Sequence, residues 1–128
     1  GGEVGATTGR ARRCGWLDIK ILKKSIELNR INGIALTKLD VLDKLDLIKI
    51  CVDYGNIDYD TFEVNDLEYI ELQGWKSSTV GITKYKDLPK NAKTYIKTIE
   101  ELSKTPIVMI STGPARDEII CLKDIFST

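Results

Sequence analysis

The stretch Ile34-Ala35-Leu36-Thr37-Lys38-Leu39-Asp40 decides the fold of this 128-residue chain. Residues 34–37 are apolar or β-branched, which is typical of a short buried strand, and charged residues follow it directly. Open α/β sheets bind their ligands at the carboxyl ends of such strands. Lys38 and Asp40 are therefore candidates for a binding site, although a solvated lysine and a helix-capping aspartate would give the same tetrapeptide.

Regular patterns on both sides of this strand predict alternating helices and strands. Helices are predicted at residues 17–29 and 89–102, the first ended by Asn32-Gly33 and the second entered through Pro89. The side chains expected to face inward are Leu17, Ile21, Ile26 and Leu28 in the first helix and Ala92, Tyr95, Ile96, Ile99 and Leu102 in the second. The other strands are predicted at residues 47–52, 67–72, 107–110 and 118–122, with an exposed excursion over residues 53–66. The alternation predicts an α/β fold of short strands with at least two amphipathic helices.

The segment from Gly5 to Trp16, GATTGRARRCGW, has the composition of a loop that binds anions. Its glycines let the backbone approach a ligand closely, and its threonines offer hydroxyl groups. Its three arginines supply planar donors that match carboxylates and phosphates. A basic surface turn is the simpler alternative. The cysteine and tryptophan that follow at once favour a loop that is attached to a core.

A second strand end carries Ser111-Thr112-Gly113-Pro114, directly after the predicted strand 107–110. Its small residues and free backbone N–H groups suit the face of a purine and its carbonyl oxygen, but alone this is an ordinary turn. Guanine presents a ring N–H and an amine on one edge, and a single carboxylate such as Asp40 can accept from both. A buried aspartate rejects adenine, because adenine lacks that pair of donors.

Composition excludes several classes of protein. Nineteen basic and nineteen acidic residues cancel, which argues against a protein dedicated to nucleic acids. The longest apolar run, residues 106–110, is too short to cross a bilayer, and no secretory signal is visible. Three widely spaced cysteines fit neither a disulfide framework nor a zinc site and are expected as buried free thiols in a reducing cytoplasm. Asp43 and Asp46 near Asp40 are expected to form a charged loop rather than a cation site.

Three segments in combination resemble adenylosuccinate synthetase. They are Gly5 to Asp18 with the pattern GATTGRxRRCGWLD, Leu36 to Asp43 with LTKLDVLD, and Ile110 to Pro114 with ISTGP, and they occur in the family's order. Residues 89–102 are similar too, so the resemblance covers essentially the whole chain. One position departs from the family, where Ala11 replaces the usual proline. That change removes no ligating group.

The resemblance implies that residues 1–128 are the C-terminal portion of a larger ligase, within a P-loop-NTPase-like fold. It assigns residues 1–16 to a loop for aspartate and inosinate (IMP), and residues 34–43 and 106–114 to the guanine-binding segments. The chain contains no phosphate loop and no histidine. The phosphate loop, the catalytic aspartate and histidine, and most of the Mg²⁺ site are therefore expected upstream, and no catalytic or metal-binding residue is assigned here.

The implied reaction is the GTP-dependent ligation of L-aspartate to IMP, which gives adenylosuccinate, in a cytoplasmic homodimer. The implied aspartate and IMP residues are Ala6, Thr7, Thr8, Gly9, Arg10, Ala11 and Arg12. The implied GTP residues are Arg12, Lys38, Leu39, Asp40, Ser111, Thr112 and Gly113. Two other functions stay open from the sequence: a guanine-nucleotide-binding module without catalysis, and a protein whose basic loop binds polyanions. Neutral net charge disfavours the second.

Overall fold

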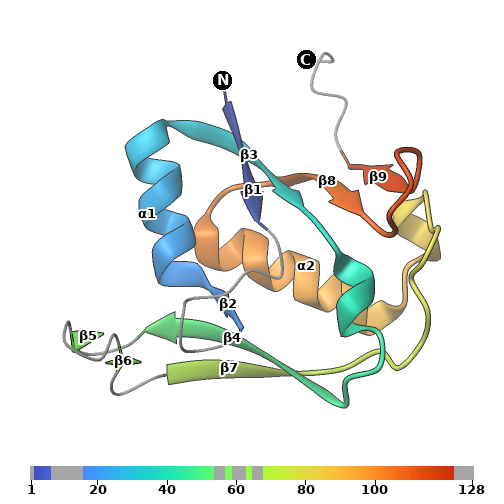
Figure 1. The fold of residues 1–128 in the computed structure, drawn as a ribbon, viewed down its shortest axis with the longest axis horizontal. Coiled ribbons are helices and arrows are strands. Elements are labelled where there is room, and N and C mark those ends of the chain that lie inside the picture. Colours follow the sequence, from blue (N-terminus) through green and yellow to red (C-terminus); the bar gives the residue numbers. More distant parts are fainter. Residues whose placement is uncertain (1, 7–15, 54–56, 59–62, 65–67, 123–128) are drawn as a thin grey trace.

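The computed structural model describes residues 2–6, 16–53, 57–58, 63–64 and 68–122, and it has the predicted α/β architecture (Figure 1). The main sheet has four strands in the order β1-β3-β8-β9. Their bounds are Gly2–Ala6 for β1, Ile31–Leu36 for β3, Ile107–Ser111 for β8 and Ile119–Cys121 for β9. Strands β1, β3 and β8 are parallel, and β9 is antiparallel to β8. Parallel neighbours of this kind need helical crossovers, which α1 and α2 provide.

A second sheet of three strands lies across the molecule from the first, in the order β2-β4-β7 (Figure 1). Its strands are Leu17–Asp18 (β2), Leu47–Asp53 (β4) and Glu68–Gln73 (β7). Short strands Ile57–Asp58 (β5) and Glu63–Val64 (β6) pair with each other in the excursion. The predicted strands at 47–52, 67–72, 107–110 and 118–122 are therefore confirmed, with ends that differ by at most one residue.

Helix α1 spans Ile19–Asn29, so it starts two residues later than predicted, and the predicted inward face is confirmed for Leu17 and Ile26 but wrong for the other two residues. Asp18 caps the helix by accepting from the backbone N–H of Ile21 at 3.0 Å, while Leu17 belongs to β2. The later start turns the buried face to Ile19 and Leu22. Two residues expected inside are consequently exposed, Ile21 at 50% and Leu28 at 72%.

The predicted break at Asn32-Gly33 is also wrong, because both residues lie inside β3. The helix ends instead at Arg30, whose φ of 50° is left-handed. Glycine at position 33 has a packing role, since a Cβ there would lie 2.9 Å from Cγ1 of Val108 on the neighbouring strand. The glycine therefore allows β3 and β8 to pack closely.

Helix α2 spans Lys90–Ser103 and confirms the predicted amphipathic pattern. Pro89 precedes it, and in Figure 1 the helix crosses between the two sheets. The buried face joins one core cluster with side chains from both sheets; its fully or nearly buried residues are Ala92, Tyr95, Ile96 and Ile99. A short 3-10 helix, η2 (Tyr85–Asp87), precedes α2, and residues 75–84 are otherwise irregular, as predicted.

Cysteine burial is confirmed in part. Cys51 is buried, but Cys121 is exposed, and Cys14 lies outside the described residues. Cys121 lies on β9, the last strand of the main sheet, where one face is open to solvent. Within the described ranges, neither helix is long and apolar enough to span a membrane.

Candidate functional site

Three predicted site segments leave the main sheet from the same edge. Ala6, the last residue of β1, pairs with Leu36, the last residue of β3, and Leu36 pairs in turn with Ile110 of β8. Because the three strands are parallel and adjacent, the chain after each of them emerges at one edge (Figure 1). The residues that follow β3 and β8 are described. The loop Thr7 to Arg12, which follows β1, lies outside the described residues.

The segments after β3 and β8 contact each other directly. The backbone N–H of Lys38 donates to Oγ of Ser111 at 2.8 Å, across 73 positions of sequence. Lys38 adopts a left-handed backbone with φ 58°, an uncommon conformation for a residue other than glycine. Its side chain is exposed, and Asp40 is half-buried beside it. The structure thus brings Lys38, Asp40 and Ser111 to one place.

A short 3-10 helix, η1 (Leu39–Leu42), carries Asp40. In a 3-10 helix, residues i and i+3 lie directly above one another. Leu39 and Leu42 accordingly share the buried face, at 0% and 7% exposure. Since the Leu39 side chain is part of the core, only its backbone remains for a ligand, and the apolar face of η1 anchors the helix that presents Asp40.

The loop after β8 is held by its own hydrogen bonds. The backbone N–H of Thr112 donates to the carbonyl of Glu118 at 2.8 Å, and the buried Thr112 hydroxyl donates to the carbonyl of Ile82 at 2.8 Å. The Glu118 carboxylate accepts from the backbone N–H of Ala115 at 3.1 Å and lies against Gly113. A Cβ at Gly113 would clash with that carboxylate, so a larger residue there would force the Glu118 side chain to move away from Ala115.

A third segment, residues 79–82, belongs to the site and was missed by the sequence interpretation. The backbone N–H of Gly81 donates to the carbonyl of Thr112 at 3.2 Å. The expectation that Asp43 lies in a charged loop is wrong, because Asp43 is only 8% exposed and accepts hydrogen bonds from Trp75 and Thr79. The spacing of LDVLDK, with leucines and aspartates each three apart, was the available signal.

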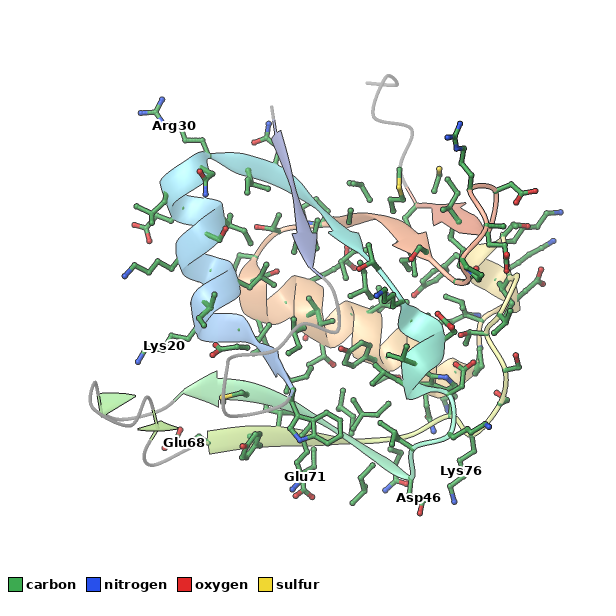
Figure 2. The ribbon with its side chains drawn as sticks, viewed as in Figure 1. Lys20, Arg30, Asp46, Glu68, Glu71 and Lys76 are labelled. Atoms are coloured by element: carbon green, nitrogen blue, oxygen red, sulfur yellow. The ribbon has the colours of Figure 1, made fainter. Side chains whose placement is uncertain are left out.

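A cavity of about 590 Å³ lies between η1 and residues 76–80. Asp40 lines it together with the half-exposed valines at 41 and 80, while Lys38 and the loop 111–113 do not. At its rim, Lys76 and Asp46 point toward each other and form an ion pair of 2.9 Å (Figure 2). Both side chains are largely exposed, so this pair contributes little to stability.

Cation ligands are not assembled at this edge. No group of three His, Cys, Asp or Glu side chains among the described residues could hold a metal ion. Both oxygens of Asp43 already accept hydrogen bonds from neutral donors. The hydroxyl of Thr37 at the end of β3 is buried and has no hydrogen-bond partner among the described residues. Leaving such a group unpaired costs about 1–3 kcal/mol.

The fold is that of an α/β protein, and its candidate site residues lie at the carboxyl ends of adjacent parallel strands, where proteins of this class bind ligands. The family model of adenylosuccinate synthetase matches residues 1–120. This chain belongs to the adenylosuccinate synthetase family.

Known proteins of the family resemble the chain along nearly all of its length. It is 52% identical over 136 residues to adenylosuccinate synthetase from Pseudomonas paraeruginosa strain PA7, which covers 99% of this chain and 32% of the relative. It is 54% identical over 132 residues to adenylosuccinate synthetase from Psychrobacter sp. strain PRwf-1, covering 97% of the chain and 31% of the relative. The fully ligated adenylosuccinate synthetase of Plasmodium falciparum superposes with a TM-score of 0.75 at 40% identity, covering 91% of this chain and 30% of that structure. The chain therefore spans about a third of the length of the relatives it matches.

Proposed function

We propose that this chain forms the guanine-binding part of an adenylosuccinate synthetase, which ligates L-aspartate to IMP at the expense of GTP. Lys38, Asp40 and the loop Ser111 to Gly113 hold the guanine base. The observation that carries the proposal is the 2.8 Å hydrogen bond from Lys38 N–H to Ser111 Oγ, because it joins two motifs of the family at the carboxyl ends of adjacent parallel strands.

The chemistry of these groups matches guanine. The Asp40 carboxylate accepts from the ring N–H and the exocyclic amine, and an ionised acceptor makes both bonds stronger than a neutral one would. The aliphatic stem of Lys38 lies across the purine face. The backbone N–H of Gly113 approaches the purine carbonyl, since those of Thr112 and Ala115 already donate to Glu118. Adenine would leave the Asp40 carboxylate unpaired, which favours GTP over ATP.

The other assignments concern parts of the enzyme that the structure does not describe. We propose that Ala6 to Arg12 form the loop over aspartate and IMP, with Arg12 also reaching GTP. The position of Ala6 at the strand edge shared with Leu36 supports this placement. On the family resemblance, the phosphate loop, the catalytic groups and most of the Mg²⁺ site are assigned to the rest of the enzyme. A homodimer in the cytoplasm is proposed on the family resemblance alone.

Asp40→Asn in the complete enzyme tests the guanine assignment. The asparagine amide would place a donor against the guanine amine, so the kcat/KM for GTP should fall by about 10²-fold, the equivalent of about 3 kcal/mol. Xanthosine triphosphate, which offers a carbonyl in place of that amine, should become the better substrate. The matched control is Asp46→Asn, an exposed carboxylate of the same loop, which should leave GTP use unchanged. A GTP KM within twofold of wild type in Asp40→Asn would refute the assignment.

The isolated 128-residue chain tests whether catalysis needs parts of the enzyme outside this chain. With GTP, IMP, aspartate and Mg²⁺, it should form no adenylosuccinate above the control without protein, because it has neither a phosphate loop nor a histidine. Guanine-nucleotide binding without turnover would be consistent with both functions, whereas product formation would contradict the proposed division of the site.

The arginine loop has its own test in the complete enzyme. In an extended segment, Arg10 and Arg12 point to the same side and Arg13 to the other. Arg10→Leu and Arg12→Leu should therefore abolish activity with little change in Tm, while Arg13→Leu should lower Tm more than it raises the aspartate KM. Lysine at position 10 or 12 should rescue little, because a point charge does not replace a bidentate fork. The assignment would be contradicted if Arg10→Leu unfolded the protein while Arg13→Leu stayed folded and lost aspartate binding. Arg10 would then be the structural residue and Arg13 the ligand-binding one.

A further inference from the structure

The buried carboxylate of Asp43 connects the helix that carries Asp40 to residues 75–79. It accepts from the Trp75 indole N–H at 2.8 Å, from the Thr79 backbone N–H at 2.8 Å and from the Thr79 hydroxyl at 2.7 Å. Thr79 is fully buried, and Asp43 is 8% exposed. All three donors are neutral, so the carboxylate is held by geometry rather than by an opposite charge.

These contacts close a ring of hydrogen bonds around the proposed guanine site. Lys38 is bound to Ser111, and Asp43, at the end of the same short helix, is bound to Thr79. The segment that begins at Thr79 returns to the loop after β8, because Gly81 donates to the carbonyl of Thr112 at 3.2 Å. The Thr112 hydroxyl donates to the Ile82 carbonyl at 2.8 Å. Three segments, 38–43, 79–82 and 111–112, thus fix one another.

The 3-10 geometry of η1 transmits this restraint to Asp40. Asp40 and Asp43 are three residues apart, so they lie above one another on the same face of the helix. The Asp43 backbone N–H also donates to the Asp40 carbonyl at 3.1 Å. A rotation of η1 that moved the Asp40 carboxylate would therefore break the bonds that Asp43 makes to Thr79.

We propose that Asp43 and Thr79 are positioning residues for guanine recognition, which they serve by fixing the Asp40 carboxylate relative to the loop 111–113. The inference rests on the proposed function of Asp40. Neither residue touches the base. A bidentate contact to guanine requires its acceptor within about 0.5 Å of the correct position, so a loosened ring weakens base discrimination before it affects the reaction itself.

Thr79→Val in the complete enzyme tests the proposal, because valine keeps the β-branched shape and removes only the hydroxyl. The readout is the ratio of kcat/KM for GTP to that for inosine triphosphate, which lacks the exocyclic amine. This ratio should fall by about threefold to tenfold through a higher GTP KM. The kcat at saturating GTP and the KM values for IMP and aspartate should stay within about twofold of wild type. Thr79→Ser, which restores the hydroxyl, should recover the ratio.

Thr105→Val is the matched control, since Thr105 is also buried and its hydroxyl also donates a hydrogen bond, in this case to the backbone carbonyl of Ser103. It precedes β8 at the opposite edge of the sheet and should lower Tm by a similar amount without changing the GTP to inosine triphosphate ratio. An unchanged ratio in Thr79→Val would overturn the positioning role, provided that Asp40→Asn collapses the ratio. An unchanged ratio in Asp40→Asn itself would instead refute the guanine assignment on which the inference rests.

Discussion

Lys38 occupies a left-handed backbone conformation at the proposed guanine site, and its replacement by glycine should separate binding from stability. The residue has φ 58° and ψ 43°, and its side chain is exposed. An L-residue in this conformation is strained through its Cβ, whereas glycine is not. Lys38→Gly removes the strain and the amine together, while Lys38→Ala removes the amine and keeps the Cβ.

The expected magnitudes follow from two opposing terms. The left-handed backbone costs an L-residue about 1–2 kcal/mol relative to glycine, so glycine relieves this strain in the folded state. Glycine also destabilises the fold by about 0.4–1 kcal/mol, because it makes the unfolded chain more flexible. Lys38→Gly should therefore change the free energy of unfolding by between about 0 and 1.6 kcal/mol in the stabilising direction. Lys38→Ala should give no gain. Both variants should raise the GTP KM by about tenfold, because both lose the side chain that covers the base.

The assay pairs equilibrium urea unfolding with GTP kinetics on the complete enzyme. Lys104→Gly is the control, because Lys104 has φ 55° at the end of α2 and is also exposed. It should show the same stabilisation with no change in GTP KM. Destabilisation by Lys38→Gly of more than about 1 kcal/mol would refute the strain argument, and an unchanged GTP KM in Lys38→Ala would refute the role of the side chain.

Three further predictions concern packing and charge, each measured by equilibrium unfolding. Gly33→Ala should lower the free energy of unfolding by about 1–2 kcal/mol, because the new methyl group crowds Val108. Val108→Ala should relieve this crowding, so a double-mutant cycle should give a coupling energy of at least about 1 kcal/mol. Additive effects of the two substitutions would contradict the close packing of β3 on β8. Gly74→Ala should cost more than Gly33→Ala, because its Cβ would meet the rigid backbone carbonyl of Leu45 rather than a side chain; an equal or smaller cost would contradict this contact. Burial raises the pKa of Tyr95 well above its usual 10.0, so above about pH 10 the unfolded state loses this proton before the folded state does. The free energy of unfolding should therefore fall by up to about 1.4 kcal/mol per pH unit in this range, and Tyr95→Phe should remove that part of the pH dependence. An unchanged pH dependence in Tyr95→Phe would contradict this prediction.

Elements with one consistent periodicity could be predicted from the sequence. The buried face of α2 follows the helical repeat from Ala92 to Ile99, and β4 alternates Ile48 and Ile50 with Lys49. The start and the buried face of α1 were predicted less well, because apolar residues near its start lie on more than one side of the helix. Burial of Leu17 in β2 rather than in the helix decides which face turns inward, and that depends on pairing between β2 and β4. The pairing between β2 and β4 joins residues that are far apart in sequence, so it produces no local sequence pattern.

The same distinction separates the parts of the candidate site. Lys38 and Asp40 follow β3 and Ser111 ends β8, so the rule that ligands bind at the carboxyl ends of parallel strands made them candidates, and the resemblance to the family selected them. Thr79 lies in an irregular segment that does not directly follow a strand or helix. This segment is held by the hydrogen bonds from Thr79 to Asp43 and from Gly81 to Thr112. The spacing of LDVLDK aligns Asp43 with Asp40, but it does not say which of the three neighbouring aspartates is buried. The resemblance named the residues proposed to touch the ligand, and the structure added those that hold them in position.

The choice of a 3-10 helix for residues 39–42 explains how one short segment can serve both the core and the site. With three residues per turn, LDVLDK separates into an apolar face, an acidic face and an exposed face formed by Val41 and Lys44. In an α-helix, two residues that are three positions apart are offset by about 60° around the helix axis. Leu39 and Leu42 could still both be buried, as residues three apart are in α2, but Asp40 would no longer lie directly in line with the anchored Asp43. The tighter helix therefore couples the core to Asp40, so a change at Leu42 should disturb base recognition as well as stability.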